Sequence, residues 1–252
     1  MIYNYHTHTK RCNHATGADR EYVEAAIKAG IKTLGFSDHA PYDFPAEIPE
    51  YSYFRMKKEE GFEYVESVRS LAKEYASDIR ILCGFEMEYY PDYHQSQMDY
   101  LKRFSPDYLI LGQHMLGNEF PTILPREAGD LHLSYYVTQV LAGLATGDFL
   151  YLAHPDLAGY GFSPETVARE YRRLALGAKR MGIPVELNAL GLREGRAYPD
   201  VRFFRFAAEA GCKVIYGVDA HSPDAFLRAD IEERAKKIAL EVGVSLITDP
   251  IL

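Results

Sequence analysis

The chain has 252 residues, of which 47% are hydrophobic and 25% charged, a composition typical of a soluble globular protein. This composition excludes a disordered chain, a collagen and a coiled coil, and no apolar run approaches the roughly 18 residues that span a bilayer. The formal net charge of −8 argues against stable nucleic-acid binding, which depends on Lys and Arg neutralising phosphates. The length suits one α/β barrel, so we expect residues 1–252 to form a single domain.

Short apolar runs alternate with longer helix-like segments along the chain. The runs are rich in Ile, Leu, Val, Phe and Tyr, which is typical of strands buried in a parallel sheet. The predicted strands are residues 2–5, 33–37, 80–85, 108–112, 150–153, 184–187 and 213–218, with a short last strand at 245–248. The predicted helices between them include residues 20–29, 57–75, 131–145, 164–181 and 202–210.

Local signals support this alternation. Ser163 and Pro164 form a typical helix start, and Gly182 stands where the same helix should end. Residues 40–56 are long, aromatic and proline-bearing, so we predict a loop or lid there. Strands alternating with helices fit either a barrel or an open doubly wound sheet. No glycine-rich nucleotide-binding loop follows any strand.

Histidine and acidic residues follow the predicted strands. In a parallel barrel all strands end on one face, so side chains placed there come together. Histidines scattered at random would not favour one end of so many strands, and we therefore predict a site with several metal ions. The residues at strand ends are His6, His8, His39, Glu86, His114, His154, Asp219 and His221.

The spacing of these residues agrees with metal binding. Side chains at positions i and i+2 of a strand point the same way, so His6 and His8 can serve one ion, and so can Asp219 and His221. Imidazole and carboxylate ligands without thiolate suit Zn²⁺, Mn²⁺ or Fe²⁺, and the ligand types alone do not choose among these ions.

The ordered set His6-Thr-His8, Ser37-Asp38-His39, Gly84-Phe-Glu86, Gln113-His114, His154-Pro-Asp156 and Asp219-Ala-His221 resembles the polymerase and histidinol phosphatase (PHP) family. Within that family, the size and motifs are most similar to the stand-alone bacterial histidinol-phosphate phosphatases. The resemblance covers the chain nearly from end to end. It implies a distorted (β/α)7 TIM-like barrel and a centre of three divalent transition-metal ions.

The resemblance also implies a set of ligands for each ion. Glu86 would bridge the first and second ions. The first ion would be held by His6, His8, Glu86 and Asp219, the second by Glu86, His114 and His154, and the third by His14, His39 and His221.

Four further residues are candidates for other roles. Asp38 could support a ligand from behind or be a buried structural acid. Asp156, two residues after His154, would share a strand face with it and could act as the general acid, or it could cap a following turn. The segment after the sixth strand is similar to a phosphate-gripping loop, in which either Arg193 or Arg196 would bind phosphate.

The resemblance, together with the stand-alone length, implies a metal-dependent phosphatase that hydrolyses L-histidinol phosphate, with Glu86 and Asp156 as catalytic residues. Other phosphate esters, an exonuclease activity and a non-catalytic metal-binding module are the alternatives. The three cysteines, Cys12, Cys83 and Cys212, have no CxxC spacing, and the first residues show no secretory signal pattern. We therefore expect a cytoplasmic protein whose partner is a small phosphorylated substrate. The sequence does not indicate the oligomeric state.

Overall fold

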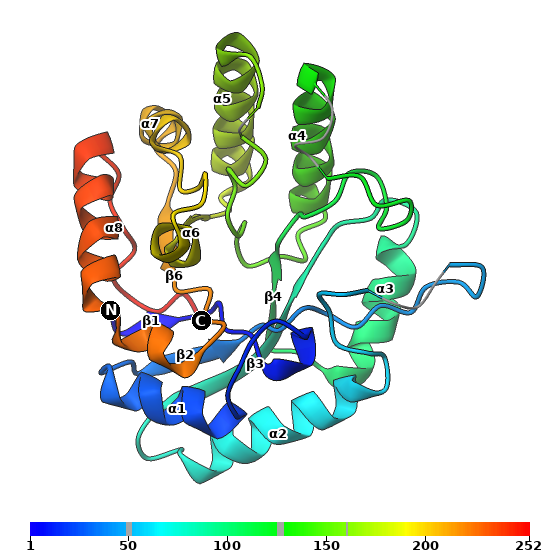
Figure 1. Cartoon of the computed structure of the whole chain (residues 1–252), viewed down its shortest axis with the longest axis vertical. Helices are drawn as coiled ribbons and strands as arrows, with labels where there is room; N and C mark the ends of the chain where they lie inside the picture. Colours follow the sequence, from blue (N-terminus) through cyan, green and yellow to red (C-terminus); the bar gives the residue numbers. More distant parts are fainter. Residues whose placement is uncertain (49–51, 125–128, 160) are drawn as a thin grey trace.

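A computed structural model describes residues 1–48, 52–124, 129–159 and 161–252, and it shows a curled parallel sheet with helices around it (Figure 1). The strands are β1 (Tyr3–Asn4), β2 (Thr33–Phe36), β3 (Arg80–Met87), β4 (Tyr108–Leu111), β5 (Val185–Asn188) and β6 (Val214–Gly217). The α-helices are α1 (Asp19–Lys28), α2 (Glu60–Glu74), α3 (His94–Leu101), α4 (Gly129–Ala145), α5 (Pro164–Met181), α6 (Ala189–Glu194), α7 (Val201–Ala210) and α8 (Ala229–Val242).

The strands form an almost continuous barrel. Parallel pairing joins β1, β2, β3 and β4 in that order, and it joins β5 to β6. Leu152 bridges Leu111 in β4 and Val185 in β5, so the segment around it fills the position between these two strands. A bridge between Thr7 and Ala220 closes the circle beyond the ends of β1 and β6. The structure is therefore the distorted α/β barrel that the resemblance to the PHP family implies, and not an open doubly wound sheet.

Two predicted strands are reduced to isolated β-bridges. Of residues 150–153, only Leu152 forms β-bridges, although the N–H of Leu150 still donates to the carbonyl of Leu109 at 2.8 Å. Of residues 245–248, only Leu246 forms a bridge, to Val214 in β6. Both segments keep strand positions in the barrel but lack the paired length of a regular strand.

The predicted start and end of the helix at residues 164–181 are confirmed. The Ser163 side chain accepts a hydrogen bond from the N–H of Thr166, and α5 ends at Gly182 with a φ of 72°. Residues 40–48 and 52–56 contain no helix or strand, as predicted for a loop, and residues 49–51 lie outside the described part. Among the described residues, no helix is both long and apolar enough to cross a membrane.

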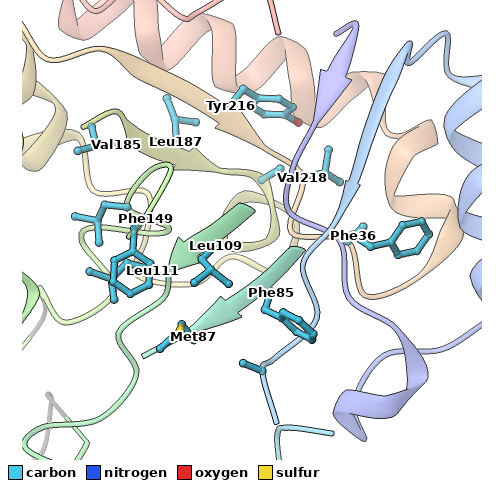
Figure 2. Close-up of a cluster of buried hydrophobic side chains, with 14 of the residues drawn as sticks. Phe36, Phe85, Met87, Leu109, Leu111, Phe149, Val185, Leu187, Tyr216 and Val218 are labelled. Atoms are coloured by element: carbon cyan, nitrogen blue, oxygen red, sulfur yellow. The ribbon is translucent and has the colours of Figure 1, made fainter. Parts of the chain in front are cut away.

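Successive side chains of each strand point to opposite faces of the sheet, and they form two apolar layers. Outward residues such as Phe85, Leu109 and Val185 pack in the core between the sheet and the helices (Figure 2). Inward residues such as Tyr108 and Ile110 form a second cluster inside the barrel. Gly35 leaves room for this inner layer, because a Cβ there would lie 2.2 Å from the Tyr108 hydroxyl oxygen. The inner cluster fills the barrel below the ends of the strands.

Candidate metal centre

The predicted ligands converge at the carboxyl ends of the strands, above the inner apolar cluster. Potential ligand atoms of His6, His8 and Asp219 all lie within 4.8 Å of one another. The same holds for His14, His39 and His221, although these residues come from three separate segments. The barrel thus brings together residues from both ends of the sequence.

Glu86, near the end of β3, stands between groups of imidazoles. Its Oε1 lies 2.9 Å from Nε2 of His154 and 3.7 Å from Nε2 of His114. Its Oε2 faces other nitrogens, at 3.3 to 3.4 Å. These belong to His6 (Nε2), His8 (Nε2) and His39 (Nδ1). The two oxygens of one carboxylate therefore point to different sets of potential ligands.

Asp219 follows β6 and completes the group on the other side. Its Oδ1 lies 3.3 Å from Nε2 of His8 and 3.3 Å from Nδ1 of His221, while Oδ2 accepts a hydrogen bond from Asn188 at 3.0 Å. Its φ of 50° is in the left-handed region, where non-glycine residues are uncommon. The strained backbone turns the carboxylate toward the histidines.

The donor atoms of the cluster fit divalent metal ions. Buried polar atoms nearly always have hydrogen-bond partners, yet several here have none. Imidazole nitrogens and carboxylate oxygens in this arrangement suit divalent transition ions. Burial alone would raise the pKa values of Glu86 and Asp219, but the surrounding histidines, His6 foremost, hold both well below their usual range. The atoms without a partner include His6 Nε2, His39 Nδ1, His154 Nδ1, Glu86 Oε2 and Asp219 Oδ1.

A cavity of about 520 Å³ opens directly above the cluster. Apart from the histidines and the two acids, its wall is mostly apolar. Arg196 also lines it and donates from Nη1 to the Tyr198 hydroxyl at 2.8 Å. The apolar lining residues are Phe54, Met115, Leu124, Leu157, Leu190 and Ala197.

Residues 4–242 match the model of the PHP domain. The chain belongs to the PHP domain family. A protein of Deinococcus radiodurans named a probable histidinol-phosphatase is 33% identical over 234 residues, which cover 86% of this chain and 85% of that protein.

Two solved structures share the PHP fold. One, described as a candidate histidinol phosphatase from Listeria monocytogenes, has a TM-score of 0.73 at 22% identity and covers 90% of this chain and 97% of that one. The other is the histidinol phosphate phosphatase of Lactococcus lactis in complex with zinc, L-histidinol and phosphate. Its TM-score is 0.70 at 16% identity, and the match covers 98% of this chain and 95% of that one.

In this PHP domain, buried carboxylates stand behind the candidate ligands. A ligand histidine usually donates its second ring N–H to such a group, which fixes the tautomer and the ring orientation. Asp38, predicted either to support a ligand or to be structural, lies behind the candidate ligand His8. The pairs are His6 with Glu186 at 2.8 Å, His8 with Asp38 at 3.3 Å and His114 with Glu88 at 2.7 Å, each through Nδ1.

Sequence reasoning missed Glu186 and Glu88. Glu186 lies in the apolar run 184–187, and a run that is apolar on both faces does not reveal which side chains point inward, while Glu88 comes just after β3, beyond the predicted run 80–85. One signal was present, because an acid inside such a run must have a partner when it is buried. Gly217 leaves room for the buried Glu186 side chain, because a Cβ at position 217 would lie 1.8 Å from Oε1 of Glu186.

The two arginines after β5 lie differently. Residues 189–194 form α6 rather than the predicted loop, because the Asn188 side chain accepts from the N–H of Gly191 and caps the helix. Arg196 follows that helix and reaches the cavity. Arg193 is not among the residues that line the cavity, and its charge acts instead on Tyr216, which belongs to the outer core.

Asp156 does not share a strand face with His154. The chain leaves the sheet after Leu152, and His154 has a φ of 27°, so the i, i+2 rule does not apply. The buried carboxylate of Asp156 accepts a hydrogen bond from the N–H of Asp200 and is not among the cavity-lining groups. Burial raises the pKa of Asp156 to about 7.

Proposed function

We propose that this PHP-domain protein is a metal-dependent phosphomonoesterase that hydrolyses L-histidinol phosphate to L-histidinol and inorganic phosphate. The observation that carries the proposal is Glu86, whose two oxygens face separate groups of imidazoles at the floor of a cavity with Arg196 on its wall. The names of the relatives support the choice of substrate.

The proposed centre takes three divalent ions, with Glu86 shared between two of them. When bound, such ions lower the pKa of water toward ~7 and neutralise charge on phosphoryl oxygens. The proposed ligands are His6, His8, Glu86 and Asp219 for the first ion, Glu86, His114 and His154 for the second, and His14, His39 and His221 for the third.

The chain's own groups bind and orient the ester. Arg196 would donate to the phosphoryl oxygens, since a guanidinium forms paired hydrogen bonds with phosphate. The apolar wall around Phe54 and Leu124 would hold the leaving group and keep out surplus water. Water attacks phosphorus and loses a proton to solvent, the P–O bond to the alcohol breaks, and the departing oxygen takes a proton. Asp156 is our candidate donor of that proton.

The proposed setting is the cytoplasm. The three cysteines are free thiols, as expected for a chain kept in a reducing compartment.

A substrate panel with metal-loaded enzyme tests the function. We expect L-histidinol phosphate to have the highest kcat/KM, with sugar phosphates and nucleotides slower. Faster turnover of a cyclic diester or a nucleotide would overturn the substrate assignment. No hydrolysis of any phosphate ester, with full metal content, would overturn the phosphatase assignment.

A further inference from the structure

Arg55 is a buried cation next to the metal centre, although neither the ligand set nor the phosphate site uses it. It is 3% exposed and belongs to the long loop after β2. Its guanidinium lies over the rings of Phe54 and Tyr42, with Cζ 4.5 and 4.6 Å from the ring centroids. Nη1 donates to the carbonyl of Ala40 at 2.9 Å. A cation this deeply buried loses its hydration and therefore needs specific partners.

Two buried carboxylates supply the opposite charge. Nη2 of Arg55 donates to Oε2 of Glu88 at 2.9 Å, and Nε donates to Oε1 of Glu119 at 3.1 Å. Glu88 is fully buried and Glu119 is 2% exposed. Tyr90 also donates to Glu119, at 3.0 Å. The guanidinium thus holds two acids that come from different segments of the chain.

Glu88 connects this group to the metal centre. Its Oε2 is occupied by Arg55, and its Oε1 lies 2.7 Å from Nδ1 of His114. A carboxylate only accepts hydrogen bonds, so Nδ1 must carry the proton. The lone pair of His114 is then on Nε2, the nitrogen that faces Glu86. Arg55 and Glu88 together determine which nitrogen of His114 can bind an ion.

Glu119 connects the group to the cavity wall. The segment after β4 carries Met115 and Leu124, and the loop of Arg55 carries Phe54, all three of which line the cavity. The ion pair between Arg55 and Glu119 fastens these two segments to each other. One guanidinium thus links two walls of the cavity to one metal ligand.

We propose that Arg55 is a positioning residue that, through Glu88, sets the ring orientation and tautomer of His114 for the second ion and, through Glu119, fixes the apolar wall of the cavity. The inference rests on the proposed function only in taking His114 as a metal ligand. It does not depend on which ester the enzyme cleaves.

The test compares Glu88→Gln and Arg55→Lys with the natural protein by metal content and by Zn²⁺ and Mn²⁺ affinity. In Glu88→Gln, Arg55 still requires an acceptor, so the amide turns its oxygen to Arg55 and its NH₂ to His114. The NH₂ group would force the proton onto Nε2 and block ligation. We expect about one ion fewer per chain, an affinity for that ion 10–100-fold weaker, and turnover that recovers when the ion is in excess. Arg55→Lys keeps the positive charge but loses the several N–H donors of the guanidinium. The loss of metal affinity should therefore be smaller than in Glu88→Gln.

Arg173→Lys is the matched control. Arg173, in α5, likewise donates to a carboxylate, Glu170 of the same helix at 3.0 Å, and to a carbonyl, that of Ser134 in α4 at 3.3 Å, but it does not line the cavity. We expect this variant to lower the melting temperature of the apo protein without changing metal affinity. Wild-type metal affinity in Glu88→Gln would overturn the proposal. So would a loss of stability without loss of metal, as in the control. If Arg55→Lys does not fold, Glu88→Gln alone decides, because it keeps the volume and the guanidinium.

Discussion

At the scale of single residues, Glu86 is a buried carboxylate whose desolvation must be offset by nearby positive charge. A buried carboxylate is costly unless it is paired, and one oxygen of Glu86 has no hydrogen-bond partner. The nitrogens of His6, His8 and His39 near this oxygen make the position favourable for a shared cation. The metal content of variants can show whether Glu86 binds two ions or only one.

We predict that Glu86→Gln loses more metal than His14→Asn, because a bridge serves two ions and His14 serves one. Both variants should keep the barrel folded, since the inner and outer apolar layers are untouched. Elemental analysis together with circular dichroism measures both effects. Full metal and full turnover in Glu86→Gln would show that the carboxylate does not bridge.

A second prediction concerns Asp156. If it protonates the departing oxygen, Asp156→Asn should lower kcat for alkyl phosphates by about 10²–10⁴-fold. An aryl phosphate such as p-nitrophenyl phosphate leaves without a proton, so its kcat should fall far less. Steady-state kinetics on both substrates decides the matter. Equal losses would assign Asp156 a structural role through its bond to Asp200.

Much of the candidate site could be predicted from the sequence, because the positions of polar residues at strand ends follow directly from the apolar runs. His6, His8 and Asp219 are examples. The supporting residues could not be, since Glu88 and Arg55 meet only through the folding of a long loop. A charged residue in a loop is more often solvated than buried. Its burial depends on tertiary packing that no local pattern records.

At the scale of secondary structure, α6 decides which arginine meets the cavity. The resemblance implied a phosphate-gripping loop here, but a helix forms, because the Asn188 cap outweighs the low helix propensity of Gly191. Gly195 ends the helix with a φ of 65°. The chain then turns back, which brings Arg196 to the cavity, while Arg193 stays on the helix.

We predict that Arg196→Ala raises KM for phosphate esters more than Arg193→Ala does. A group that holds phosphate equally in the ground and transition states changes KM rather than kcat when it is removed. Inhibition by inorganic phosphate is an independent measurement and should weaken in parallel for Arg196→Ala. A larger effect at Arg193 would mean that α6 rotates when substrate binds.

At the scale of the whole molecule, the metal centre should contribute to stability. Ions that bind the folded chain and not the unfolded one stabilise it by mass action, about 2.7 kcal/mol at one hundred times Kd. We predict close to three transition-metal ions per chain after purification without chelator, and a lower melting temperature after chelation. Elemental analysis and calorimetry check both. One ion or none in fully active protein would contradict the three-ion assignment.

Closure of the barrel also has a consequence for synthesis of the chain. Asn4 accepts a hydrogen bond from the N–H of Val218, 214 residues away, and the candidate ligands His8 and Asp219 lie beside this seam. Contacts so distant in sequence form slowly, because a long loop must close first. A nascent chain therefore exposes His6 and His8 while most of the barrel is still being translated. The proposed centre could assemble only after Asp219 and His221 have left the ribosome, so metal capture would belong to a late stage of folding.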